Sequence, residues 1–73
     1  MSNLPQISGR ECTKALSKVG FYIKRQQGSH IVLRRDEPFG QLVVPDHKTL
    51  DRGTLRAIIR QAGLGVEEFI NLL

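Results

Sequence analysis

Two histidines are the side chains of this sequence best suited to acid–base chemistry. His30 follows Gly28 and Ser29 at the start of an apolar run, and His47 follows a second apolar run that ends at Pro45. An imidazole with its ordinary pKa near ~6.5 gives or takes a proton at neutral pH. Cleavage of a phosphodiester needs such a group at the attacking hydroxyl or at the leaving oxygen. On residue type alone, a histidine that packs or faces water without a proton role is the commoner case.

Residue counts and spacing argue against other kinds of site. Cys12 is the single cysteine, so an internal disulfide is impossible, and two histidines and one cysteine far apart do not make a zinc site. Ser29 and Cys12 lack the spacing of a nucleophile triad, and no phosphate-binding loop is present. We therefore expect no metal and no cofactor. Asp46 and Asp51 lie near enough to His47 in sequence to orient it, although spacing alone does not establish this.

The charge pattern favours a polyanionic partner. The chain of 73 residues carries 11 Lys and Arg against 7 Asp and Glu, a net charge of +4, and the last 13 residues contain two acids and no base. Basic residues recur every four positions in two sets, Arg10/Lys14/Lys18 and Arg52/Arg56/Arg60, and such spacing places each set on one helix face. Such stripes bind phosphates without sequence preference, but a solvated helix face is the more common explanation. The residues that we expect to contact RNA are Arg10, Lys14, Lys18, Lys24, Arg25, Arg34, Arg35 and Lys48.

Aromatic residues offer little for base stacking. Phe21 and Phe69 fit a core, which leaves Tyr22 and Phe39 as the candidates. Single-strand RNA binders usually carry stacking platforms. We therefore expect recognition through the RNA backbone and shape rather than through stacking.

Three segments have the apolar spacing i, i+3, i+4, i+7 of amphipathic helices. The first is expected between Ser8 and Gly20, because Ser8 and Glu11 form a capping-box pair and Gly20 suits a helix end. The second is expected between residues 51 and 63, with Asp51 as its cap and Gly63 as its stop. The third begins near Gly65 and continues the apolar stripe to Leu73. These apolar stripes are Cys12/Ala15/Leu16/Val19, Leu55/Ile58/Ile59/Ala62 and Val66/Phe69/Ile70/Leu73.

The segment between the first two helices reads as three strands. The first extended run begins at residue 21, and the other two span residues 30–34 and 41–44. The segments that separate these runs, residues 27–29 and 36–40, contain turn-forming residues. We expect an α+β fold: a three-stranded antiparallel sheet packed on helices, in the order α-β-β-β-α with an extra short C-terminal helix, as one domain over residues 1–73. The alternation along 30–35 does not decide which face is buried, because both sets of residues contain apolar and basic members.

Several segments together resemble HicA-type toxins. They are Ile7-Ser8-Gly9-Arg10-Glu11, Gly20-Phe21, Gln27-Gly28-Ser29-His30, Val44-Pro45-x-His47, the run from Gly53 to Leu64, and Val66-Glu67-Glu68-Phe69. The resemblance covers nearly the whole chain in the right order. Two positions depart from it: many relatives have a second histidine where Ile31 stands, and often Ser or Thr where Gly65 stands.

The resemblance implies an RNA endonuclease of a toxin–antitoxin pair with a double-stranded-RNA-binding-domain-like fold. It implies that His30, in the Gly28-Ser29-His30 motif, is the catalytic residue, that no metal is required, and that a HicB-type antitoxin covers the active region. Because Ile31 follows, His30 is expected to be the only imidazole of its turn, with His47 as a possible assistant.

The sequence therefore predicts a metal-independent ribonuclease toxin that cleaves messenger RNA through His30. A module of the same fold that grips structured RNA without cutting it is the alternative, and an interaction protein within a repressor complex is a third possibility. We expect a cytoplasmic protein that is monomeric when free and does not contact membranes. The lone thiol fits a reducing compartment, no apolar run approaches the ~20 residues of a span, and residues 1–5 lack signal-peptide features.

Overall fold

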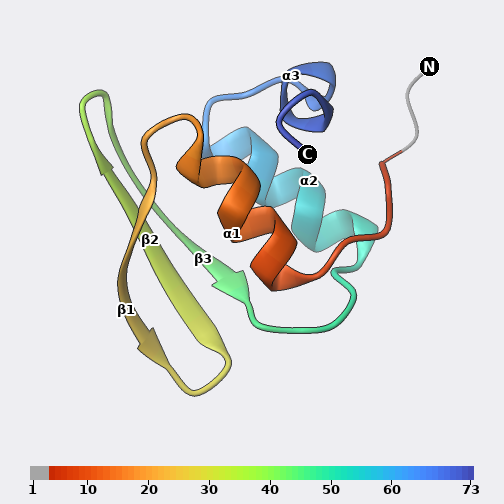
Figure 1. Cartoon of the computed structure of the whole chain (residues 1–73), viewed down its shortest axis with the longest axis horizontal. Helices are drawn as coiled ribbons and strands as arrows, with labels where there is room; N and C mark the ends of the chain where they lie inside the picture. Colours follow the sequence, from red (N-terminus) through yellow and green to blue (C-terminus); the bar gives the residue numbers. More distant parts are fainter. Residues whose placement is uncertain (1–3) are drawn as a thin grey trace.

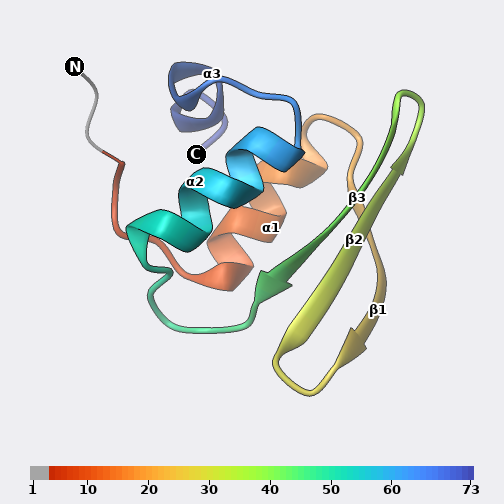
Figure 2. The ribbon, with the colours of Figure 1, turned by 180° about the vertical axis from the view of Figure 1, so that it is seen from behind.

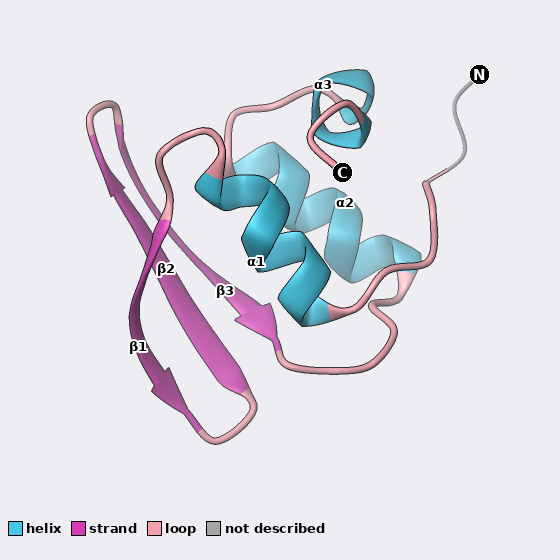
Figure 3. Ribbon diagram, in the orientation of Figure 1, coloured by secondary structure: helices cyan, strands magenta, loops and turns pink. Residues whose placement is uncertain are grey.

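The computed structural model describes residues 4–73. Residues 1–3 lie outside the described residues, and they belong to the segment 1–5 that is expected to lack signal-peptide features. Six elements follow one another in the predicted order (Figure 1), and Figure 3 distinguishes the helices from the strands. They are α1 (Gly9–Ser17), β1 (Tyr22–Gln27), β2 (His30–Asp36), β3 (Phe39–Pro45), α2 (Arg52–Gln61) and α3 (Val66–Ile70). No helix within residues 4–73 is long and apolar enough to cross a membrane.

Helix α1 begins with the predicted capping box. The Ser8 side chain accepts from the Glu11 backbone N–H at 3.0 Å, and the Glu11 carboxylate accepts from the Ser8 N–H at 2.9 Å. These bonds satisfy two backbone donors that no helical carbonyl can reach. Gly20, with φ of 100°, ends the turn after the helix in a conformation that disfavours other residues. The start of α1 is therefore fixed locally, by residues 8–11.

The three strands form an antiparallel meander in the order β1-β2-β3. The hairpin turns are shorter than predicted. Gln27 belongs to β1, Asp36 belongs to β2, and Phe39 and Gly40 belong to β3, so the connections reduce to residues 28–29 and 37–38. Strand pairing continues through these positions because Gln27 pairs with His30 and Phe39 pairs with Asp36.

Both helices α1 and α2 lie on one side of the sheet (Figures 1 and 2). Ile31, Leu33, Leu42 and Val44 point to that side and are at most 3% exposed. They pack with Leu16, Phe21, Leu55, Ile58 and Phe69 in one core. Position 31 therefore faces the core, where an apolar side chain is favoured over an imidazole.

The opposite side of the sheet carries the alternate residues, and no helix lies over it (Figures 1 and 2), although Val32 in the central strand is only 5% exposed. We call this the outer face. From the register, its members are Tyr22, Arg25, Gln27, His30, Val32, Arg34, Asp36, Phe39, Gln41, Val43 and Pro45.

The later helices depart from the sequence expectation at their ends. Asp51 occupies the N-cap position of α2 with extended backbone, but its side chain makes no capping hydrogen bond. At α3, the Gly65 N–H donates to the Glu68 carboxylate at 2.8 Å, which is the half of a capping box that needs no side chain at the cap. The helix ends at Ile70 rather than continuing to Leu73, which is 49% exposed.

Candidate functional site

His30 stands at the first position of β2, directly after the two-residue turn Gly28-Ser29. Gly28 has φ of 58°, a left-handed conformation that glycine adopts without steric cost, and a Cβ there would meet no atom within 4 Å. The turn thus needs glycine for its backbone and not for lack of space. The His30 side chain is exposed on the outer face, and it makes no hydrogen bond within the described residues.

The end of β3 lies beside this turn. Pro45 is the strand partner of His30, and the Asp46 N–H donates to the Ser29 carbonyl at 2.7 Å. The next residue, His47, uses its carbonyl to accept from the Gly9 N–H at 2.8 Å. The turn before β2, the exit of β3 and the start of α1 are therefore joined by backbone hydrogen bonds, and both histidines belong to this junction.

A side-chain network reinforces the junction. Arg10 donates through Nε to Asp46 Oδ1 at 3.2 Å and through Nη2 to Asp46 Oδ2 at 3.0 Å, and also to the Gln26 Oε1 at 3.0 Å. Gln26 in turn donates to Asp46 Oδ2 and to the Gly28 carbonyl, both at 3.1 Å. The network ties α1, β1 and the β3 exit to the turn that precedes His30.

Asp46 is the centre of this network. The hydrogen bond from Arg10, followed by those from Gln26 and by the positive charges of Arg10 and His47, lowers the pKa of Asp46 below its usual 3.8, against an opposing effect of partial burial. A carboxylate that stays ionised holds Arg10 in a two-pronged contact. Asp46 and Asp51 are the two acids expected as orienting groups for His47. The Asp46 carboxylate accepts hydrogen bonds from Arg10 and Gln26, and the Asp51 side chain makes no capping hydrogen bond at α2.

The predicted RNA-contacting residues divide into two groups. Arg25 and Arg34 lie on the outer face, Lys24 lies at the irregularity between Ile23 and Arg25 in β1, and Lys48 is exposed three residues beyond β3. These residues share the sheet side or the β3 exit with His30.

The other four residues lie on the helix side, and contacts hold three of them. Arg10 is bound to Asp46, and the Lys18 ammonium donates to the Leu72 carbonyl at 2.6 Å. Arg35 points toward the helices, where it lies over the Phe21 ring at 4.5 Å and donates to backbone carbonyls. The exposed side chain of Lys14 makes no hydrogen bond or ion pair within residues 4–73. Sequence spacing missed these structural roles, because most of the partners lie far away along the chain.

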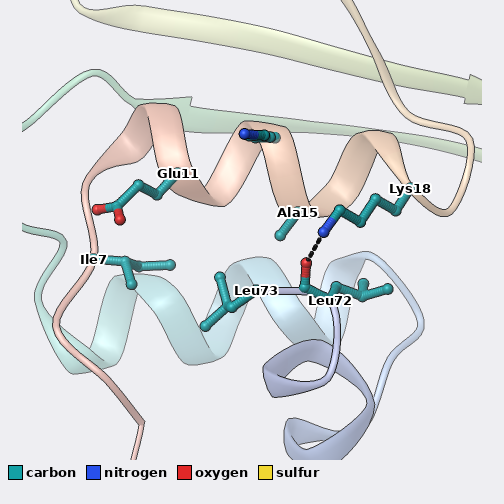
Figure 4. A pocket seen from close by; sticks show the side chains of 7 residues that line it. Ile7, Glu11, Ala15, Lys18, Leu72 and Leu73 are labelled. Atoms are coloured by element: carbon teal, nitrogen blue, oxygen red, sulfur yellow. Dashed lines mark hydrogen bonds between the residues drawn. The ribbon is translucent and has the colours of Figure 1, made fainter.

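Two surface grooves lie away from His30. Figure 4 shows the groove between α1 and the C-terminal residues, where Lys14, Lys18, Leu72 and Leu73 are among the lining side chains. The second runs along α2 and is lined by Arg56 and Arg60, two members of the second basic stripe. Within residues 4–73 no three potential metal ligands gather in one place. The junction at His30 lies outside both grooves, and the side chains of His30 and His47 are exposed there.

Comparison with known proteins places this arrangement in a family. No curated protein matches the chain. The family model described as the HicA toxin of bacterial toxin–antitoxin systems matches residues 9–64, from the start of α1 to the residue after the Gly63 turn. The match spans the turn before His30, the β3 exit and the whole of α2. The chain belongs to the HicA toxin family of bacterial toxin–antitoxin systems.

Proposed function

We propose that this protein is an endoribonuclease toxin that cleaves messenger RNA, with His30 as the general acid or base and without a metal ion. The observation that carries the proposal is the position of His30. Its imidazole is exposed at a strand end whose backbone is joined to the β3 exit and to α1. Family membership supports the toxin role.

The proposed reaction is attack of a ribose 2′-hydroxyl on the adjacent phosphate. The new 2′-O–P bond forms as the 5′-O–P bond breaks, which leaves a 2′,3′-cyclic phosphate and a 5′-hydroxyl. His30 takes the proton of the attacking hydroxyl or gives one to the leaving oxygen. One imidazole in this role contributes about 10²–10⁴-fold. Positive side chains near the junction contribute by stabilising the charge that develops on the phosphate.

His47 is the candidate for a second proton-transfer group. It follows Asp46, whose N–H is bonded to Ser29, so its backbone is held near the His30 turn. We propose an assisting role for His47 and the primary role for His30. A HicB-type antitoxin is the proposed protein partner, and the free toxin is proposed to be a monomer.

The test is cleavage of a messenger RNA by purified His30→Ala and His47→Ala variants, with folding checked by circular dichroism and thermal unfolding. We expect His30→Ala to lose at least about 100-fold in cleavage rate, and His47→Ala to lose less. An RNA with a 2′-deoxyribose at the cleaved position should resist the wild-type protein.

Three outcomes would contradict the proposal. Cleavage by a folded His30→Ala variant at the wild-type rate would remove His30 from the mechanism. Loss of activity on addition of a chelator would indicate a metal mechanism. Intact RNA after incubation with the wild-type protein, with binding retained, would favour the non-catalytic RNA-binding module.

A further inference from the structure

The outer face of the sheet carries two exposed aromatic side chains at the end opposite His30. Phe39 is 66% exposed and Tyr22 is 45% exposed. Tyr22 stands opposite Arg34 in the β1–β2 pairing, and Phe39 stands opposite Asp36 in the β2–β3 pairing. Both rings therefore project from the same face, although they come from strands on either side of β2.

Local contacts hold both rings in place. The Tyr22 hydroxyl donates to the Asp36 carboxylate at 3.1 Å, and the Arg34 guanidinium lies 5.2 Å from the centre of the Phe39 ring. Arg34 also pairs with Asp36 at 3.0 Å. The ordinary pKa of a tyrosine, 10.0, already keeps this ring neutral at physiological pH, and partial burial and the bond to Asp36 raise the pKa of Tyr22 further. Fixed, neutral aromatic rings suit base stacking, because little side-chain freedom is lost on binding.

The charges on this face favour an anionic ligand. Arg25 and Arg34 are its basic members, and Asp36, its single acid, is already paired with Arg34. Six residue steps along β2 separate His30 from Asp36, a distance of about 20 Å. The face thus runs from a pair of rings, past two guanidinium groups, to the imidazole.

Positive charge does not by itself distinguish the outer face from the helix side. Arg10 and Lys18 of the α1 stripe are bound to Asp46, Gln26 and the Leu72 carbonyl, but Lys14 of α1 and Arg52, Arg56 and Arg60 of α2 are exposed. The difference between the two sides lies in the exposed aromatic rings. Domains that bind double-stranded RNA read shape and backbone and do not need exposed aromatic rings. Sheets that present aromatic rings bind single strands, whose unpaired bases stack on them.

We propose that the outer face binds single-stranded RNA, with bases stacked on Tyr22 and Phe39 and the strand directed to His30. The proposal rests on the proposed ribonuclease function and names its substrate class. It replaces the sequence-based expectation of recognition without stacking, because the register brings together on one face two rings that are separated by 17 residues in sequence.

Binding is tested by fluorescence anisotropy with a labelled, unstructured RNA in which every ribose is 2′-O-methylated, so that cleavage cannot occur. Tyr22→Ala and Phe39→Ala are each expected to raise the Kd about fivefold or more. Phe39→Trp should restore affinity, since it keeps a stacking surface. The matched control is Ile23→Ala: this side chain is 47% exposed on the same strand as Tyr22 but on the other face, and its loss should leave the Kd unchanged.

Each contrary result is distinct. Tighter binding of the duplex than of the single strand, with weakening by Lys14→Ala and not by Phe39→Ala, would overturn the proposal in favour of the helix side. Unchanged RNA affinity in both ring variants, with loss of antitoxin binding, would make the outer face a protein interface. Failure of the ribonuclease proposal alone would appear as intact RNA in the cleavage assay while the ring variants still weaken binding.

Discussion

At the scale of single residues, Asp46 connects the candidate catalytic turn to the rest of the protein. Its backbone N–H bonds the Ser29 carbonyl, and its carboxylate bonds Arg10 and Gln26. The position of His30 therefore depends on an acid that lies 16 residues away in sequence. We regard Asp46 as a positioning residue, since it acts on the junction and not on the RNA.

The lowered pKa of Asp46 leads to a prediction about pH. The Arg10–Asp46 contact stabilises the fold fully above the usual carboxyl pKa of 3.8, and this contribution is lost as the pH falls through the lower pKa of the folded state. The wild-type protein should therefore be more stable than Asp46→Asn at neutral pH, and the two should converge below pH 3.8. Urea unfolding across this pH range measures the difference.

Asp51→Asn is the control for this experiment, because the Asp51 side chain makes no capping hydrogen bond. It should leave the neutral-pH stability close to that of the wild type. A constant difference between the wild type and Asp46→Asn down to the lowest pH would show that the Asp46 carboxylate charge does not hold the junction.

At the scale of elements, the sequence predicts local features well and leaves long-range ones open. The capping box at Ser8 and Glu11 lies within four residues, so the start of α1 is readable directly. The buried face of β2 is not readable, because Val32 and Arg34 alternate with Leu33 and Arg35 and both sets are half apolar. Only packing against the helices decides between them. His30 is recognisable from its turn, whereas the bond between Arg10 and Asp46 spans 36 residues.

Contact between α1 and the end of β3 predicts different effects for two helix-start glycines. A Cβ on Gly9 would overlap the Pro45 carbonyl oxygen, whereas a Cβ on Gly53 would be 3.8 Å from its nearest atom, an oxygen of the Asp51 carboxylate. Gly9→Ala should destabilise by about 1–3 kcal/mol, because the β3 exit must shift. Gly53→Ala should stabilise by about 0.5–1 kcal/mol, since alanine loses less backbone freedom in a helix.

Urea unfolding midpoints of the two glycine variants test this difference. RNA cleavage should fall in Gly9→Ala, because the shift moves residues 45–47 next to His30, and should be unchanged in Gly53→Ala. Equal stability of Gly9→Ala and the wild type would mean that the close approach of α1 to Pro45 is not required.

At the scale of the whole molecule, the fold is two layers, with the helices on one side of the sheet and the outer face open (Figures 1 and 2). This arrangement separates stability from the proposed chemistry: the core forms on the helix side, while His30 and the aromatic rings stay exposed. Adjacent arginines of β2 reflect the division. Arg34 lies on the outer face beside Phe39, and Arg35 lies among the helix ends.

Arg35 should therefore contribute to stability in a way that Arg34 does not. Its guanidinium donates to the carbonyls of Pro38 at 2.9 Å, Ala62 at 3.3 Å and Val19 at 3.4 Å, and so joins the β2–β3 turn to the segments that end α1 and α2. Arg35→Met keeps the apolar stem but loses these bonds, and should cost about 2–3 kcal/mol, which lowers the Tm by roughly 10 °C or more. Lysine at this position should restore little, because one ammonium cannot reproduce the planar fork of the guanidinium.

Arg34→Ala is the matched control and should shift stability by less than about 0.5 kcal/mol, since Arg34 pairs at the surface. Thermal unfolding of the three variants decides the matter, and equal losses at positions 34 and 35 would mean that the helix ends are held together without Arg35.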